Sequence, residues 1–154
     1  VALVGAGFRT TMLGRSVEAQ RGFAQSLGVQ LGSLSERVLA ELAPAVVVNA
    51  TPVGSEAGGA GERLVPGWMP TAGTVVVDSI YRPATTRLLR DAAAAGAAVI
   101  PGLELFLGQA AAQVRVFTGK DVSTSVLRSL LAGVGAGGVA THRDGDRSGV
   151  GGAA

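Results

Sequence analysis

Short apolar runs rich in β-branched residues recur along this chain, separated by amphipathic stretches and by turns. Runs of this kind are typical of strands that are buried on both faces of a parallel sheet. The βα rhythm around the runs near residues 45, 74 and 97 predicts an α/β fold with a doubly wound, mainly parallel sheet. The predicted strands are Val1–Val4, Thr10–Leu13, Val29–Leu31, Ala45–Val48, Thr74–Asp78 and Ala97–Ile100.

The helical stretches carry start and stop signals. Ser16 is suited to cap the first helix and Gly28 to end it, while Ser33 and Glu36 have the spacing of a capping box. The predicted helices are Val17–Leu27, one from the capping box to about Leu42, one from Thr85 or Thr86 to Ala95, Leu103–Phe117 and Val122–Ala132. One face of the longest helix carries an apolar stripe that we assign to the core: Leu103, Phe106, Ala110, Val114 and Phe117.

The first predicted strand runs directly into Gly5-Ala6-Gly7. A strand followed by Gly-x-Gly opens the dinucleotide-binding fingerprint of Rossmann folds. The next strand already begins at Thr10, whereas a parallel crossover needs about a dozen residues or more. Either the crossover helix has been deleted, or the two strands form an antiparallel hairpin. We favour a Rossmann-like sheet whose first βαβ crossover is truncated by deletion, with a hairpin or a poorly ordered edge as the result.

The stretch Asn49–Gly54, Asn-Ala-Thr-Pro-Val-Gly, directly follows a predicted strand. Polar groups at the carboxyl end of a parallel strand lie at the edge where open α/β sheets bind ligands. We therefore interpret this stretch as a loop that holds, or once held, the nicotinamide end of a dinucleotide. We expect Trp68, beyond the Gly-rich residues 54–67, to pack against the protein rather than to stack on a ligand.

Arg15 follows the second predicted strand. An acidic residue at this position binds the adenosine ribose of NAD, whereas an arginine pairs with the 2′-phosphate of NADP. Arg15 therefore indicates NADP, and the alternative is a solvated arginine in the turn that starts a helix.

Composition predicts one domain followed by a tail. The chain has 154 residues, 47% of them hydrophobic but only 4% aromatic, so its core must consist of Ala, Val and Leu. We predict a domain over residues 1–133 and a disordered Gly/Ala-rich tail over residues 134–154. His142, the single histidine, falls in this tail and is an improbable ligand or base.

Charge and cysteine content exclude several classes. The 13 basic and 11 acidic residues form no run of like charges, so we expect no nucleic-acid partner. The lack of cysteine excludes disulfides and thiolate zinc sites, and we expect a cytoplasmic protein without a metal. No apolar stretch approaches the roughly 18–20 residues that span a bilayer, so we expect no membrane partner. The opening Val-Ala-Leu-Val suggests an internal fragment rather than a signal peptide.

Three segments together resemble the shikimate dehydrogenase family, specifically its carboxy-terminal NADP-binding domain. Order and spacing agree across about residues 10–132, and Asp-x-x-Tyr-x-Pro together with Gly-x(6)-Gln-Ala is specific. The matching segments are Val-Val-Asn-Ala-Thr-Pro-Val-Gly (47–54), Val-Val-Asp-Ser-Ile-Tyr-Arg-Pro-Ala-Thr-Thr-Arg-Leu-Leu (76–89) and a third from Gly102 to Gly119 that contains Gly-Gln-Ala.

The resemblance implies roles for individual residues. Tyr81 and Gln109 would contact the carboxylate or hydroxyls of the substrate, although the residues alone also suit a packing tyrosine and an exposed helical glutamine. The positions implied for NADP are Gly5 and Gly7 in the diphosphate loop, Arg15 and Ser16 at the 2′-phosphate, and Asn49, Thr51, Ser79 and Gly102 on the nicotinamide side.

The resemblance also implies a reaction, reversible hydride transfer between NADPH and the ketone of 3-dehydroshikimate. In the family, the proton-transferring Lys and Asp lie in an amino-terminal substrate domain, so we expect no catalytic residue here and little activity from this chain alone. Two alternatives stay open: a non-catalytic nucleotide-binding or interaction module, and another Rossmann-type reductase.

Overall fold

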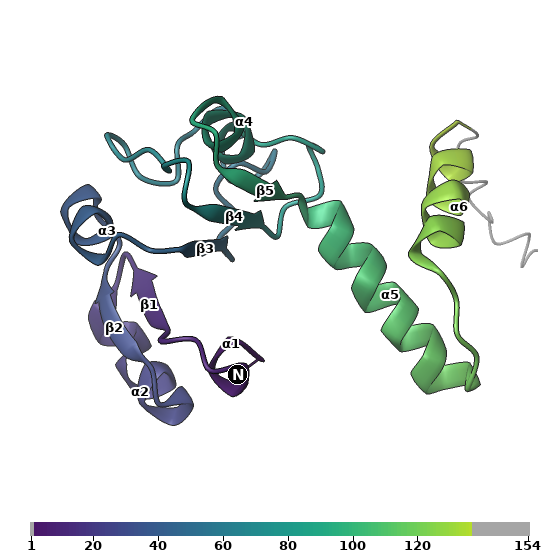
Figure 1. Cartoon of the computed structure of the whole chain (residues 1–154), viewed down its shortest axis with the longest axis horizontal. Coiled ribbons are helices and arrows are strands. Elements are labelled where there is room, and N and C mark those ends of the chain that lie inside the picture. Colours follow the sequence, from purple (N-terminus) through teal and green to yellow (C-terminus); the bar gives the residue numbers. More distant parts are fainter. Residues whose placement is uncertain (1, 137–154) are drawn as a thin grey trace, which may run out of the picture. The chain divides into compact units, whose positions relative to one another are not determined.

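The computed structural model describes residues 2–136, which fall into two compact units, Val1–Phe106 and Leu107–Ala154 (Figure 1). Helix α6 (Thr124–Ala136) ends the described part of the second unit. The tail predicted from residue 134 onward, with His142, lies outside the described residues except for 134–136. No helix within residues 2–136 has both the length and the apolar character needed to cross a membrane.

The first unit contains two parallel sheets. One pairs β1 (Thr11–Gly14) with β2 (Gln30–Ser33). The other has the order β3 (Val46–Asn49), β4 (Val75–Asp78) and β5 (Ala98–Ile100). Helices alternate with these strands along the chain (Figure 1). The predicted α/β fold with a parallel, Rossmann-like sheet is confirmed.

Helices connect most successive strands. Helix α2 (Val17–Leu27) joins β1 to β2, α3 (Glu36–Leu42) joins β2 to β3, and α4 (Arg87–Ala94) joins β4 to β5. Gly28 ends α2 with a φ of 65°, and its N–H donates to the carbonyls of Ala24 and Gln25. These bonds satisfy carbonyls that the end of a helix leaves open, as the sequence predicted.

The predicted first strand, Val1–Val4, is wrong. Residues Ala2–Gly5 form helix α1, and Gly7 in the turn that follows has a φ of 85°. The Gly7 N–H donates to the Val4 carbonyl at 3.0 Å, and the Phe8 N–H donates to the Leu3 carbonyl at 3.0 Å. This is the double bond pattern of a Schellman motif, in which glycine takes the left-handed position. Gly5-Ala6-Gly7 therefore closes a helix that leads into β1, and the described residues 2–10 form neither the predicted strand nor a hairpin.

The predicted capping box is also wrong, by two residues. Ser33 ends β2, and Ser35 is the N-cap of α3, where its hydroxyl accepts a hydrogen bond from the Val38 N–H at 3.4 Å. A capping box requires its acidic residue three positions after the cap. Glu36 directly follows the cap here, so it lies in the first turn of the helix instead.

The core of the first unit lies between α4 and its sheet. Val76 of β4 packs with Leu88, Leu89 and Ala92 of α4 and with Ala97. Trp68 and Leu64 pack against this cluster, so the prediction that Trp68 is a packing residue is confirmed.

The apolar stripe of α5 (Gly102–Thr118) does not form a core. Phe106 is 40% exposed and Phe117 is 82% exposed, whereas Gly102 and Leu107 are buried. A helical period identifies the apolar face of a helix, but it does not identify what covers that face.

The partly buried carboxyl group of Asp91, on α4, forms ion pairs with Arg63 in the loop before β4 and with Arg87 on α4. Arg63 Nε lies 3.0 Å from Asp91 Oδ2, and Arg87 Nε lies 3.0 Å from Asp91 Oδ1. Burial raises the pKa of Asp91, but hydrogen bonds from Arg87 and Arg63, together with their charges, outweigh burial and lower the pKa below its ordinary 3.8. A lowered pKa in the folded state stabilises the fold above the unfolded pKa, and this stabilisation is lost as the pH falls through the folded pKa.

We expect Arg63→Gln to raise the pKa of Asp91 and to lower the free energy of unfolding at pH 7 by up to about 1 kcal/mol, the scale of a partly exposed ion pair. The difference from wild type should vanish in acid, below the folded pKa of Asp91. Urea unfolding at pH 7 and in acid, with an NMR titration of the carboxyl carbon, measures both effects. Arg37→Gln, which removes an exposed 3.8 Å pair with Glu41, is the matched control. A difference that persists in acid would contradict this account.

Candidate functional site

The loop after β3 is shaped by the side chain of Asn49, which is 1% exposed. Its Nδ2 donates to the Val53 carbonyl and to Asp78 Oδ1, both at 3.1 Å. Its Oδ1 accepts from the Thr51 N–H at 3.0 Å and from the Thr51 hydroxyl at 2.7 Å. An asparagine side chain offers two donor hydrogens and two acceptor lone pairs, and all four are used here. Asn49 therefore fixes the loop and has no hydrogen-bonding capacity left for a ligand.

Asp78 performs the same task for the loop after β4 and is fully buried. Besides Asn49, its Oδ1 accepts from the Ile80 N–H at 3.1 Å. Its Oδ2 accepts from the Thr86 hydroxyl at 2.6 Å. Thr86 is the N-cap of α4, and its hydroxyl in turn accepts from the Leu89 N–H at 3.3 Å. The hydrogen-bonded side chains of Asn49, Asp78 and Thr86, here named the strand-end network, join two loops to the start of a helix.

Side chains beside this network remain open to solvent. Ser79 is exposed, and its backbone N–H donates to the Asn49 carbonyl at 3.0 Å. Tyr81 is 51% exposed, and its ring stacks on Phe106 with centroids 5.4 Å apart. The buried network thus presents a serine and a tyrosine at the carboxyl end of β4.

Gly102, the first residue of α5, is buried against the loop after β4. A Cβ atom at this position would lie 2.8 Å from the carbonyl carbon of Ser79 and would overlap the Ile80 carbonyl. Because the obstacle is backbone, a side chain cannot be accommodated by rotation. Glycine is therefore required for the close approach of α5 to this loop.

A second group of predicted residues follows β1. Arg15 and Ser16 are both exposed, and Ser16 occupies the N-cap position of α2 without a side-chain capping bond. The structure shows no hydrogen bond or ion pair for the Arg15 side chain within residues 2–136. A guanidinium, a hydroxyl and the open N–H groups of a helix are all donors for an anion.

The predicted residues thus fall in four places. The loops after β3, β4 and β5 bring together Asn49, Thr51, Ser79, Tyr81 and Gly102. The loop after β1 carries Arg15 and Ser16, and Gln109 lies on α5 in the second unit. Gly5 and Gly7 lie at the C-terminal end of α1, whereas diphosphates bind at helix N-termini, so this placement does not favour their predicted role.

Sequence reasoning missed Asp78 and Thr86. Both lie in the segment 76–89 that carries the family resemblance. Thr86 was considered only as a possible helix start, and neither residue was assigned a part in the site. The available signal was an aspartate that ends an apolar strand, followed by a threonine suited to cap the next helix. Within residues 2–136, no group of three or more His, Asp or Glu side chains could hold a metal ion.

Comparison with known proteins relates this geometry to a family. The chain is 34% identical over 131 residues to the shikimate dehydrogenase (NADP(+)) of Salinibacter ruber, a match that covers 80% of this chain and 46% of that protein. It is 39% identical over 133 residues to the protein of the same name from Natronomonas pharaonis, over 84% of this chain and 48% of that one. The chain is a homologue of the shikimate dehydrogenases. No family model matches the sequence.

Solved shikimate dehydrogenases share the fold. The enzyme from Aquifex aeolicus matches with a TM-score of 0.74 and 27% identity, over 84% of this chain and 47% of that one. The enzyme from Thermus thermophilus, in complex with NADP(H) and shikimate, matches with a TM-score of 0.66 and 30% identity, over 80% and 45%. The chain spans about half the length of the shikimate dehydrogenases it matches. The predicted family resemblance is confirmed.

We expect Thr86→Ala to lower the free energy of unfolding by about 2–4 kcal/mol, the combined scale of a lost N-cap and a buried acceptor left without its donor. Thr86→Ser keeps the hydroxyl and should recover most of this loss. Urea unfolding followed by far-UV circular dichroism measures both variants. Thr85→Ala, at the exposed neighbouring position, is the matched control and should change little. Equal stability of Thr86→Ala and wild type would show that the strand-end network does not hold this part of the fold.

Proposed function

We propose that this chain is the NADP-binding part of an oxidoreductase of the shikimate dehydrogenase type. The observation that carries the proposal is the exposed Arg15, without a partner in the described structure, at the carboxyl end of β1. In doubly wound folds the end of the second strand of the dinucleotide-binding unit selects between NAD and NADP, and an arginine there suits the 2′-phosphate. The family resemblance assigns Arg15 to that position. The curated relatives named above are NADP(+) enzymes, and the Thermus thermophilus structure contains NADP(H).

The residues after β1 fit a phosphate group. The Arg15 guanidinium can pair with phosphate oxygens, because its planar fork matches phosphate geometry. The Ser16 hydroxyl makes no capping bond, and the N-terminus of α2 adds N–H donors and the positive end of the helix dipole.

We propose that the loops after β3, β4 and β5 contact the nicotinamide end of NADP. The contribution of Asn49 and Thr51 differs from the prediction. Asn49 and Thr51 hydrogen-bond to each other, so we propose that they set the shape of the loop and that backbone groups of this loop contact the cofactor. Ser79 is exposed and available, and Gly102 lets the start of α5 lie against the loop that carries Ser79. NADP bound here would exchange a hydride with the carbonyl carbon of a small-molecule substrate, which we propose is 3-dehydroshikimate.

Tyr81 and Gln109 are the residues that we propose for substrate binding. Both residues are exposed, and a tyrosine hydroxyl and a glutamine amide can hydrogen-bond a carboxylate or hydroxyls. We propose that the proton-transferring Lys and Asp come from a substrate domain of the kind the family has, since no described side chain is assigned that task. We also propose that the protein is cytoplasmic, as predicted from the sequence.

Calorimetric titration with NADP and with NAD tests the proposal. We expect NADP to bind more tightly than NAD, and Arg15→Gln to weaken NADP binding by roughly tenfold or more, the scale of a lost hydrogen bond to a charged group. NAD binding should be unchanged in this variant, because NAD lacks the 2′-phosphate. Arg21→Gln, on the helix that follows Arg15 but paired with Glu18 at 2.8 Å, is the matched control. Equal affinity for the two cofactors, or an Arg15→Gln variant that binds NADP normally, would refute the assignment of Arg15.

A further inference from the structure

The loop after β4 and the start of α5 leave neighbouring strands at the same edge of a sheet. Strands β4 and β5 are paired so that Val77 lies opposite Ile100. Residues 79–81 follow β4, and α5 follows β5 after the single residue Pro101. Because both segments leave the carboxyl ends of adjacent parallel strands, the pairing of the strands holds the first turn of α5 beside this loop.

Helix α5 contacts this loop at two positions that are one turn apart. Gly102 lies against the backbone of Ser79 and Ile80, where a Cβ atom would have no room. Phe106 stacks on Tyr81, with ring centroids 5.4 Å apart and 28° between the ring planes. Residues four positions apart lie on the same face of a helix. One face of α5 therefore makes both contacts with the loop.

The hydrogen bonds that fix the loop after β4 stop one residue before Tyr81. The Ser79 N–H donates to the Asn49 carbonyl, and the Ile80 N–H donates to Asp78 Oδ1. Within residues 2–136, the Tyr81 side chain makes no hydrogen bond and stacks on no other ring than that of Phe106. The tyrosine hydroxyl is thus left open to a ligand.

Burial alone does not hold either ring in place. Tyr81 is 51% exposed and Phe106 is 40% exposed, whereas the next residue of α5, Leu107, is buried. Offset-stacked aromatic rings with centroids 4.5–7 Å apart attract each other beyond the effect of the area they bury. A tyrosine can use its ring for packing while its hydroxyl contacts a polar group. The stacked pair therefore suits a tyrosine that binds a ligand through its hydroxyl.

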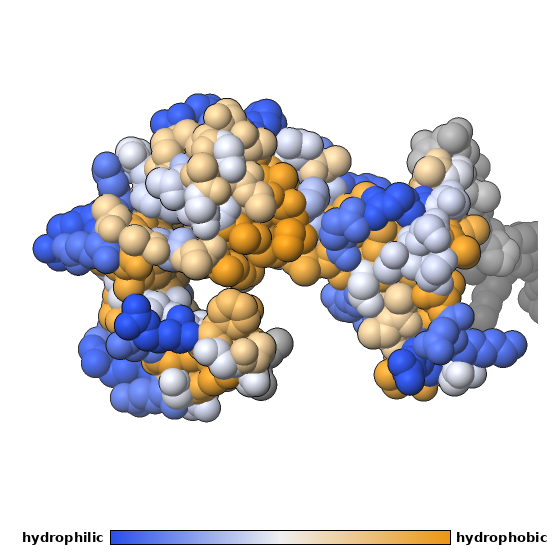
Figure 2. All heavy atoms as spheres, in the orientation of Figure 1, coloured by the Kyte–Doolittle hydropathy of each residue, from blue (hydrophilic) through white to orange (hydrophobic). Residues whose placement is uncertain are grey.

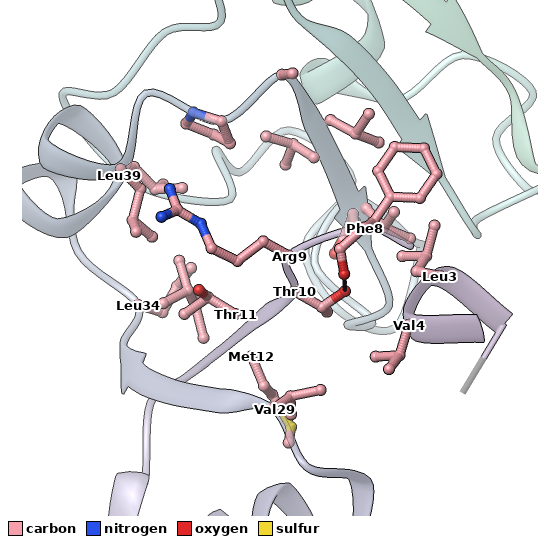
Figure 3. A pocket seen from close by; sticks show the side chains of 18 of the residues that line it. Leu3, Val4, Phe8, Arg9, Thr10, Thr11, Met12, Val29, Leu34 and Leu39 are labelled. Carbon is pink, nitrogen blue, oxygen red and sulfur yellow. Dashed lines mark hydrogen bonds between the residues drawn. The ribbon is translucent and has the colours of Figure 1, made fainter. Parts of the chain in front are cut away.

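Exposed apolar side chains occur elsewhere in the first unit without such an arrangement. Figure 2 shows hydrophobic residues at the surface of this unit. Phe8, for example, is 51% exposed and lines a groove to which β1 and β3 contribute (Figure 3). Among the described residues, its ring stacks on no other ring. Phe106 differs from Phe8 because it supports a side chain of the candidate site.

We propose that α5 orients Tyr81 for the substrate, with Gly102 setting the distance between helix and loop and Phe106 supporting the tyrosine ring. Phe106 is thus a positioning residue, and Gly102 acts on Tyr81 as well. The inference rests on the proposed function, because it takes Tyr81 to contact the carboxylate or a hydroxyl of a small molecule. A ring that changes rotamer offers its hydroxyl for only part of the time, which weakens binding by that fraction.

NMR spectroscopy of Tyr81, the only tyrosine of the chain, tests the proposal. The couplings between its Hα and Hβ protons report how the side chain divides between the stacked χ1 rotamer and the others. We expect Phe106→Leu to lower the equilibrium constant for the stacked rotamer by about two- to tenfold, the scale of an aromatic pair. Phe106→Tyr keeps an aromatic ring and should restore the wild-type value. Phe8→Leu is the matched control and should change nothing at Tyr81.

Gly102→Ala tests the second contact, because it leaves Phe106 in place. The added Cβ atom would overlap the Ile80 carbonyl, so we expect α5 to move away from the loop. Tyr81 should then lose the stacked rotamer as it does in Phe106→Leu. Far-UV circular dichroism checks that the variants are folded, and if Gly102→Ala is not, the two Phe106 variants decide the proposal.

Loss of the stacked rotamer in Phe106→Leu, together with its recovery in Phe106→Tyr, supports the proposal. Unchanged couplings in Phe106→Leu overturn it, and so does a similar change in Phe8→Leu, which would indicate general loosening. A folded Gly102→Ala variant with wild-type couplings overturns the role of Gly102. The measurement uses neither cofactor nor substrate, so a negative result here is distinct from a failure of NADP binding.

Discussion

The first unit depends on a buried hydrogen bond between two side chains at the ends of adjacent strands. Asn49 Nδ2 donates to Asp78 Oδ1 at 3.1 Å, and neither residue is more than 1% exposed. Buried polar groups cost free energy unless every donor and acceptor is paired. The chain meets this requirement by folding two loops and the start of α4 onto the pair, through Thr51, Ile80 and Thr86.

This constraint explains the layout of the candidate site. Because Asn49 and Asp78 use their polar atoms internally, they set the backbone path of the loops and leave Ser79 and Tyr81 at the surface. Gly102 allows α5 to start directly against the same loop. A site of this type is preorganised, since the groups that face a ligand are held by a network that does not itself contact the ligand.

Structural features that depend on neighbouring residues in the sequence were predicted correctly. The β-branched runs after residues 45 and 74 became strands, and Gly28 ended α2, because each depends on the conformational preference of a few neighbouring residues. The stretch Val1–Val4 was misread because Gly-x-Gly after an apolar run suits both a diphosphate loop and a helix end. The bonds from Gly7 and Phe8 back to the helix decide between the two.

Structural features that depend on contacts between residues far apart in the chain could not be predicted from the sequence. The loop Asn49–Gly54 was correctly placed after a strand, but sequence alone could not show that the Asn49 side chain points into the protein, because that depends on Asp78 in the adjacent strand. The exposure of Phe117 and the open edges of β1 and β3 depend in the same way on what packs beside them.

The central claim is that Asn49 and Thr86 stabilise the fold together through Asp78. A double-mutant cycle with Asn49→Ala and Thr86→Ala, measured as free energies of unfolding in urea, tests it most directly. We predict a coupling energy of about 1 kcal/mol or more, because each single change already weakens the network that the other residue uses. Losses that add to within about 0.5 kcal/mol would contradict the account, since residues that act independently show additive effects.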